Sequence, residues 1–242
     1  MDLPHGWLPR ARVLGVDLAW GTRNPDGFAE IIYDGQSRRG EVLQICLSRG
    51  DADLLAKTRA SEFPTLLAVD APLVCRNETG SRPVDRETHV RFGRQHAGCH
   101  PANLNLVPRP AGLLRRWRGQ GYRAHWSLQV KHRLAIEVYP HPAMVRWFSL
   151  STILKYKRSP ISNRRSEFRR YQSLLIQLLE SEFSWLAWSK ADLILDAPWT
   201  KDGEDQLDAF FCSLIGLWHL HYRGTRSQIL GDAQTGFLVV PY

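Results

Sequence analysis

The stretch RVLGVDLAWG, residues 12–21, places one carboxylate in an otherwise apolar run. A short, nearly all-apolar run of this kind is typical of a central β-strand. Asp17 therefore lies at or near the end of a predicted strand. The same arrangement recurs in TLLAVDAPL (65–73), which contains Asp70, and in LAIEVYPHP (134–142), which contains Glu137. Three acidic residues in three predicted strands indicate one shared site.

The composition is that of a globular protein with a sizeable core. The chain has 242 residues, of which 43% are hydrophobic, and it shows no internal repeat. This length suits one large domain, so we expect residues 1–242 to form a single domain.

The start of the chain, MDLPHGWLPRARVLG, contains no apolar stretch long enough for a signal peptide. No run of about 18 apolar residues occurs, so we expect no membrane-spanning helix and no membrane partner. Four cysteines are scattered along the chain, which argues against a disulfide scaffold. These features predict a cytoplasmic protein.

Positive charge is concentrated in two parts of the chain, whose formal net charge is +8. Residues 76–133 hold twelve basic and three acidic residues, and a second basic cluster, KYKRSPISNRRSEFRR, covers residues 155–170. Acidic positions set in a basic frame suit a polyphosphate substrate with divalent metal ions. The same charges also fit a protein that has Arg-rich exposed loops and no nucleic-acid partner.

The periodicity of apolar residues predicts a mixture of strands and helices. Strands are expected at 13–20, 28–35, 41–48, 65–70 and 134–139, and a closing hairpin at 227–230 and 236–241. Helices are expected at 51–63, 110–119, 164–188 and 204–221, with another beginning at 144. Three strands in a meander, then a helix, two strands and further helices indicate an α/β fold with a mixed sheet. Residues 75–130, rich in Arg, Gly, Pro and His, are predicted to be a basic insertion after the fourth strand.

Five motifs in a fixed order resemble one known family: GVDLAWG, AVDAPL, NETGSRPVD, YPHPA and DQLDAF. The family is DUF429, whose members are predicted ribonuclease H-like nucleases, and the resemblance runs from about Arg12 to Pro241. It implies a ribonuclease H-like mixed sheet flanked by helices, and it implies nuclease chemistry.

The acidic residues fit a divalent-metal site. Metal-assisted phosphodiester cleavage uses several carboxylates to hold two ions roughly 3.5–4 Å apart, and Mg²⁺ and Mn²⁺ prefer oxygen ligands. Asp17 and Asp70 would be neighbours in a ribonuclease H-like sheet. Asp208 enters an apolar helix, where a carboxylate is costly unless a cation pairs with it. We therefore predict Asp17, Asp70 and Asp208 as catalytic ligands of Mg²⁺ or Mn²⁺.

Glu137 and Asp205 are predicted as additional metal ligands, each with an ordinary alternative. Glu137 could instead pair with an arginine of the insertion, and Asp205 could be an exposed acid favoured by the helix dipole. Asp17 could accept a hydrogen bond from a backbone amide, and Asp70 could cap the turn that follows it.

Substrate contacts are predicted from donors close to these acids. Asn77 and Arg82 follow the Asp70 strand in a glycine-containing loop, and Arg115 and Arg116 lie in the basic insertion, where they would hold phosphates without reading sequence. His141 could contact a phosphate or orient a water, or simply fill a turn between two prolines.

Aromatic and sulfur-containing side chains in the insertion allow two further interpretations. Trp117 and Trp126 lie among arginines and would either stack on unpaired bases or be buried under the insertion. His96, Cys99 and His100 beside Cys75 are zinc-ligand types, but their spacing matches no common structural zinc site.

Together these features predict a metal-dependent phosphodiesterase or nuclease that acts on DNA or RNA. One alternative is a non-catalytic module on the same fold that binds nucleic acid or a protein partner. A second is a nucleotide-handling enzyme of the ATPase or kinase-like kind. That reading requires two duplicated halves with Gly-rich phosphate loops, for which the chain looks too short.

Overall fold

The structure is a computed structural model that describes residues 10–59, 61–129 and 133–242. Most of the stretch in which we expect no signal peptide, residue 60 of the predicted helix 51–63 and residue 130 of the predicted insertion lie outside the described residues. No helix in the described part of the chain is long and apolar enough to span a membrane.

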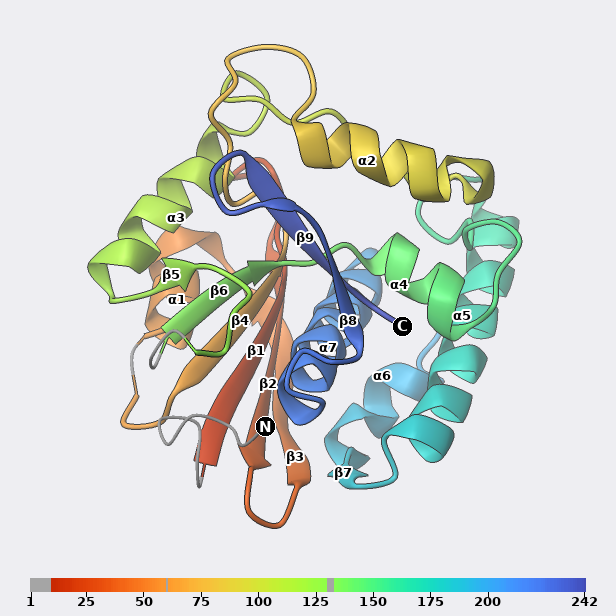
Figure 1. The fold of residues 1–242 in the computed structure, drawn as a ribbon. Coiled ribbons are helices and arrows are strands. Elements are labelled where there is room, and N and C mark those ends of the chain that lie inside the picture. The colour runs from red at the N-terminus through yellow and green to blue at the C-terminus, as the bar shows by residue number, and fades with distance from the viewer. Residues whose placement is uncertain (1–9, 60, 130–132) are drawn as a thin grey trace.

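A seven-stranded mixed sheet forms the centre of the molecule, in the order β5-β6-β4-β1-β2-β3-β7 (Figure 1). The strands are β1 (Arg10–Asp17), β2 (Asp26–Asp34), β3 (Arg39–Ser48), β4 (Thr65–Asp70), β5 (Arg123–Ala124), β6 (Arg133–Glu137) and β7 (Leu186–Ala187). β1, β2 and β3 form an antiparallel meander, and β4 and β6 continue the sheet parallel to β1. The predicted α/β fold with a mixed sheet is confirmed.

Helices cover both faces of this sheet (Figure 1). They are α1 (Gly50–Lys57), α2 (Pro83–Phe92), η2 (Gly93–Gln95), α3 (Pro108–Gly119), α4 (Pro140–Trp147), α5 (Ile161–Glu182), η3 (Ser189–Ala191), α6 (Asp192–Asp196) and α7 (Lys201–His221). α1 and α3 lie on one face, and α7 packs directly on β1, β2 and β4 from the other. Apolar side chains on both faces of β1 and β4 are therefore buried, as in sheets covered by helices on both sides.

A separate two-stranded sheet closes the chain on the α7 side. β8 (Ser227–Asp232) pairs antiparallel with β9 (Gly236–Pro241), as the sequence predicts, with the turn at 233–235. Val239 bridges to Val138, so the hairpin is attached to the segment that follows β6.

Several element boundaries differ from the predicted ones. The helix expected over 51–63 ends at Lys57, and the position before Pro64 explains only why Phe63 is not helical. α4 begins at Pro140 rather than at residue 144, since proline fits the first helical turn. The helix expected to reach residue 188 ends at Glu182, and 186–187 form β7 instead.

The predicted insertion at 75–130 is more regular than its composition indicates. It contains α2, η2, α3 and β5, and of these the sequence predicts only a helix within α3. α2 has four buried residues in an otherwise polar sequence, so its apolar periodicity is weak.

Two glycines bring α7 close to the sheet and so fix where its acidic residues lie. A Cβ on Gly15 would lie 2.1 Å from the Ala209 carbonyl oxygen, and one on Gly27 would lie 1.9 Å from that of Asp205. Both obstacles are backbone atoms of α7, which no side-chain rotation can relieve. The positions of Asp205 and Asp208 relative to β1 therefore depend on the lack of a side chain at Gly15 and Gly27.

Replacing Gly15 by Ala is expected to destabilise the protein by about 1–3 kcal/mol, because the added methyl group forces α7 away from β1. Urea unfolding followed by circular dichroism measures the change. Gly119→Ala is the control, since a Cβ added there meets no atom within 4 Å beyond its chain neighbours and the backbone of its own helix. An unchanged unfolding midpoint in Gly15→Ala would contradict the close approach.

Candidate active site

Two strand ends bring Asp17 and Asp70 together. Each is the last residue of its strand, and the parallel register between β1 and β4 pairs them directly. Neither carboxylate makes a hydrogen bond or close ion pair with another residue in the described ranges. Both residues line the same surface hollow. The predicted convergence of these two acids is thus present in the structure.

The third predicted acid, Asp208, lies on α7, the helix that packs on one face of the sheet. Asp208 is fully buried, and its Oδ1 accepts a hydrogen bond of 2.8 Å from the Tyr156 hydroxyl. Its Oδ2 lies 2.7 Å from Nζ of Lys157. Asp208 also contributes to the raised pKa values of both Asp17 and Asp70, so the three carboxylates form one electrostatic cluster. We call Asp17, Asp70 and Asp208 the carboxylate cluster.

Lys157 is the cation that faces this cluster. Burial alone would lower the pKa of its ammonium group, but the carboxylates of Asp17, Asp208 and Asp70 outweigh that effect and raise the pKa well above its ordinary value. The lysine is therefore charged and ion-paired at neutral pH. One positive charge opposes three acidic groups.

The carboxyl groups of Asp17 and Asp70 are hard to ionise. Burial raises the pKa of Asp70 to about 7, with the nearby Lys157 opposing the shift and Asp208 adding to it. Burial likewise raises the pKa of Asp17 well above its ordinary value, again against Lys157 and with Asp208 and Asp70. Carboxyls with strongly perturbed pKa values in a surface hollow are characteristic of functional sites.

Asp205 lies beside the cluster but has a partner of its own. Its Oδ1 accepts from Lys201 Nζ at 2.6 Å, and the same ammonium contacts Glu204 at 2.9 Å. Asp205 lines a hollow that also contains Asp17. It is thus a neighbour of the predicted metal position and forms an ion pair with Lys201, which it shares with Glu204.

Glu137 is engaged differently from its predicted role as a metal ligand. Both of its oxygens accept from Arg82, at 2.6 and 2.8 Å, and Oε2 also accepts from the Leu73 amide. The pairing with an arginine of the insertion, the alternative that the sequence left open, is the one present. Both oxygens of Glu137 are therefore engaged by protein donors, with the positive charge of Arg82 beside them.

Arg82 is a buried structural cation rather than the predicted phosphate contact. Besides Glu137 it binds Asp85 at 2.8 Å and the Val74 carbonyl at 3.0 Å, and it is only 1% exposed. Breaking such a buried pair leaves an uncompensated charge, so this arginine is fixed in place. It ties α2 to the end of β6.

Asn77, predicted to contact substrate, instead holds its own loop together. Its side-chain amide donates to the carbonyl oxygens of Thr79, Gly80 and Ala102. Arg115 and Arg116 lie on α3, where they line a hollow of about 570 Å³ that does not include the carboxylate cluster. Arg116 pairs with Asp51 at 3.3 Å.

His141 lies in the same hollow as Asp17 and Asp70. It is the second residue of α4, and burial together with Lys157 lowers the pKa of its ring to about 4, so the ring is neutral. Its Nδ1 is buried and has no hydrogen-bond partner within the described residues. A small ligand in the hollow could supply the missing partner.

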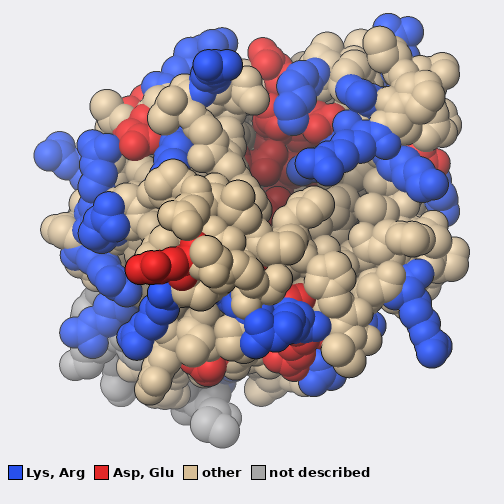
Figure 2. Space-filling view, turned by 90° about the horizontal axis from the view of Figure 1, so that it is seen from above, with Lys and Arg blue, Asp and Glu red and all other residues tan. Residues whose placement is uncertain are grey.

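Two hollows meet at the cluster and form what we call the trough. The larger has a volume of about 770 Å³ and the smaller about 550 Å³. They share four residues: Asp17, Leu18, Trp20 and Lys157. Figure 2 looks onto this end of the molecule and shows acidic side chains at the floor of a hollow, with Lys and Arg on its rim.

Three residues of the site were not predicted from the sequence: Lys157, Tyr156 and Trp20. Lys157 belongs to the basic cluster 155–170, but nothing in that pattern distinguishes it from lysines that face solvent. Conversely, Trp117 is fully buried and donates to Thr58, which confirms burial over stacking for that residue. Among the residues with described positions, no group of three or more His, Cys, Asp or Glu could hold a metal ion by itself, and this includes the suggested zinc ligands.

These features define an α/β protein with a seven-stranded mixed sheet, helices on both faces and a buried carboxylate cluster at one end of its central strands. The family model described as "Protein of unknown function (DUF429)" matches residues 15–235, and the chain therefore belongs to the DUF429 family. No curated protein and no solved structure matches it.

The raised pKa of Asp70 predicts how this residue affects stability. Its carboxyl favours the folded state when protonated, and this contribution is lost as the pH rises from its ordinary pKa of 3.8 towards about 7. Asp70→Asn removes the cost of ionisation. In metal-free buffer it is expected to raise the free energy of unfolding by about 1–3 kcal/mol at pH 8, and by less at pH 5.

Denaturant titrations of both proteins at the two pH values measure this difference. Asp53→Asn is the matched control with the opposite sign, because a hydrogen bond from Lys57 lowers the pKa of Asp53. That variant is expected to lose stability at neutral pH. Equal effects of Asp70→Asn at pH 5 and pH 8 would contradict the raised pKa.

Proposed function

We propose that this protein is a metal-dependent phosphodiesterase that acts on nucleic acid. The observation that carries the proposal is the pairing of Asp17 with Asp70 beside the buried Asp208. These two carboxylates lie at the open end of a hydrophobic sheet and have no close partner among the described residues. Burying such groups together is unfavourable unless a cation joins them. A site of this kind is suited to hard divalent metal ions.

The topology supports the finer assignment to a ribonuclease H-like fold. An antiparallel meander of three strands is followed by two parallel strands, β4 and β6, on the far side of β1. The acids stand at the ends of β1 and β4 and on the last long helix, the positions that the family resemblance implies.

The donor set fits a divalent ion in type and charge, with one condition. Asp17 and Asp70 offer oxygens that are unpaired within the described part of the chain, whereas Asp208 is engaged by Lys157. As the structure describes them, the three carboxylates do not form a closed ligand group, and the Lys157 ammonium lies against Asp208. Metal binding therefore requires the Lys157 side chain to move away from Asp208.

A bound Mg²⁺ or Mn²⁺ would supply an activated water and stabilise the leaving oxygen. The residues of the chain position the reactants around it. Tyr156 holds Oδ1 of Asp208, which fixes the orientation of that carboxylate. His141 is neutral and its Nδ1 has no partner among the described residues. It is placed to donate to a phosphate oxygen, or to exchange a hydrogen bond with a water, in the larger hollow. Lys157, once released, carries its charge into the same hollow.

A non-catalytic binding module is the second candidate, and one observation favours it. Lys157 already supplies a positive charge to the cluster, so the fold does not need a metal ion to hold the acids together. On this reading nucleic acid would bind without being cleaved. The nucleotide-handling alternative has less support, since the described residues form one seven-stranded sheet and no second copy of it.

The proposal predicts that Asp17→Asn abolishes metal-dependent cleavage while the fold is retained. The substitution removes a charged metal ligand, but the asparagine side chain has nearly the same volume as the aspartate side chain. The assay uses labelled single-stranded and duplex DNA and RNA with Mg²⁺, Mn²⁺ or a chelator. Cleavage is expected to fall to the level of the chelator sample. Asp192→Asn, an exposed acid on α6, is the control and is expected to cleave like the wild type. Wild-type protein that cleaves nothing, or full activity in Asp17→Asn, would overturn the proposal.

Lys157→Met is expected to strengthen Mn²⁺ binding by roughly tenfold or more at pH 7.5, because it removes a positive charge in contact with Asp208. Isothermal titration calorimetry measures the affinity without reference to activity. Lys190→Met, at an exposed position in η3, controls for loss of one charge. Unchanged or weaker binding in Lys157→Met would show that the lysine does not compete with the metal.

A further inference from the structure

The trough is open on both sides of the carboxylate cluster. The larger and smaller hollows share Asp17, Leu18, Trp20 and Lys157, so the cluster lies at their junction rather than at a closed end. The smaller hollow shares Thr22 with the third hollow, which is lined by Arg115 and Arg116. Three hollows in series suit an extended ligand that passes across the cluster.

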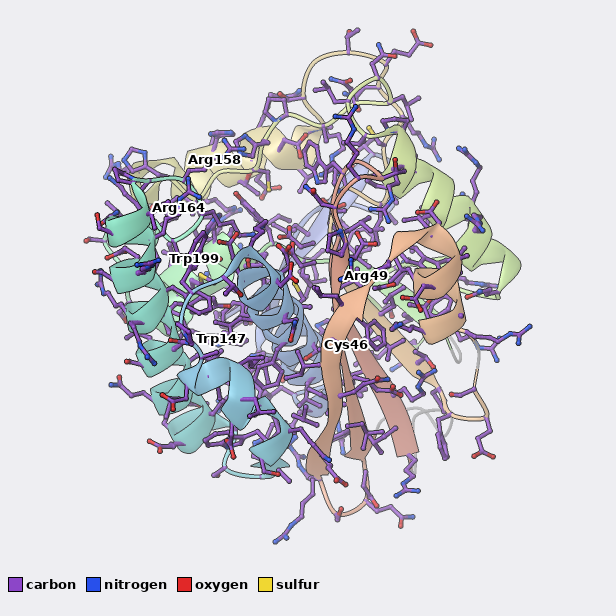
Figure 3. The ribbon with its side chains drawn as sticks, turned by 180° about the vertical axis from the view of Figure 1, so that it is seen from behind. Cys46, Arg49, Trp147, Arg158, Arg164 and Trp199 are labelled. Carbon is purple, nitrogen blue, oxygen red and sulfur yellow. The ribbon has the colours of Figure 1, made fainter. Side chains whose placement is uncertain are left out.

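Cations without acidic partners line this path. Arg23 lies in the smaller hollow, and Lys155 and Arg158 lie in the larger one. None of the three side chains makes an ion pair or side-chain hydrogen bond with a residue that the structure describes. Figure 3 labels Arg158 at the same end of the molecule. Unpaired cations on both sides of an acidic floor are complementary to a chain of phosphates.

Trp20 presents an aromatic face at the junction itself. It is 38% exposed, and its ring contacts no other ring or guanidinium among the described residues. The tryptophans at 147, 185 and 218 differ, because each packs against other aromatic rings. Leu106, 54% exposed, adds apolar surface to the larger hollow. Exposed apolar surface next to unpaired cations is the combination that binds unstacked bases together with their phosphates.

We propose that the trough binds a single-stranded polynucleotide, with one base stacked on Trp20 and the flanking phosphates held by Arg23, Lys155 and Arg158. In a duplex each base is already stacked on its neighbours and is unavailable to Trp20. The proposal rests on the proposed function for the position of the scissile phosphate at Asp17 and Asp70. The binding itself does not require a metal ion.

Binding is measured by fluorescence anisotropy of labelled 15-nucleotide DNA and RNA strands and of a hairpin duplex, in buffer with EDTA so that no metal-dependent cleavage occurs. The wild type is expected to bind the single strands more tightly than the duplex. Trp20→Ala is expected to weaken single-strand binding about tenfold, and Trp20→Phe to retain most of it. Leu193→Ala, at an apolar residue that is 85% exposed on α6, is the control and is expected to bind like the wild type.

The charge contribution is tested separately. Arg158→Gln is expected to weaken binding and to reduce the slope of log affinity against log salt concentration by about 0.7, the value for one phosphate contact on a single strand. Arg39→Gln makes the same charge change at an exposed residue of β3 that lines none of the three hollows, and it is expected to leave the slope unchanged.

Two outcomes would overturn the inference: duplex bound as tightly as single strands, or Trp20→Ala binding like the wild type. Failure of the inference is distinguished from failure of the proposed function by a small substrate, bis(4-nitrophenyl) phosphate. If the wild type hydrolyses this diester with Mn²⁺ but binds no oligonucleotide, the trough assignment fails and the metal-dependent chemistry stands. If it does neither, both fail.

Discussion

The parallel register between β1 and β4 is the constraint on which the rest of the site depends. It places Asp17 beside Asp70 at two neighbouring strand ends, where burial and nearby carboxylates disfavour their ionised forms. A fold can hold such an arrangement only if other contacts supply the free energy. The strands themselves supply it, because Val13, Val16 and Val69 are fully buried beneath helices on both faces of the sheet.

Asp208, the third acid of the cluster, is positioned by helix packing rather than by strand register. α7 can approach β1 and β2 closely because Gly15 and Gly27 have no side chains, and this approach brings Asp208 to the strand ends. Lys157 comes from yet another segment, the loop before α5. One lysine then faces three acids, so the cluster retains an unbalanced negative charge whenever the acids ionise. That imbalance is the physical basis for expecting a further cation.

The sequence predicts the acids better than it predicts their surroundings. Asp17 and Asp70 are recognisable because a carboxylate interrupts an apolar strand, and Asp208 because it enters an apolar helix. Their meeting follows from the topology and is present in the structure. Lys157 could not be predicted, because a lysine in a basic loop gives no sign of turning inward. The sequence leaves open a pairing of Glu137 with an arginine of the insertion, but that this arginine is Arg82 depends on how the insertion folds, because the two residues lie far apart in the chain.

The central strands and the longest helices are predictable because each is marked by its own apolar residues, as the apolar runs of β4 and α7 show. Weakly patterned elements such as α2 and the two-residue strands β5 and β7 are not, since tertiary contacts rather than local sequence stabilise them. The site shows the same division. The strands and the helix that carry its acids can be predicted from local sequence patterns. Its ion pairs cannot, because they join residues that are far apart in the chain.

The positive charge of the chain divides into two groups with different consequences. Arg12, Arg82 and Arg109 are largely buried in ion pairs with Glu30, Glu137 and Asp26, and they stabilise the fold without offering charge to a ligand. Arg23, Lys155 and Arg158 line the trough and have no acidic partner in the part of the chain that the structure describes. The net charge of +8 therefore says less about the ligand than the location of these unpaired cations does.

An anion that approaches the trough is attracted by the cations on either side of the acidic floor and repelled by the acids at the centre of the floor. A simple anion gains little from such a field, since its whole charge lies at one point. A chain of phosphates is attracted along its length, and the single phosphate over Asp17 and Asp70 is tolerated once a cation lies between them. The charge pattern of the trough thus favours a polyanion bound together with a metal ion over either one alone.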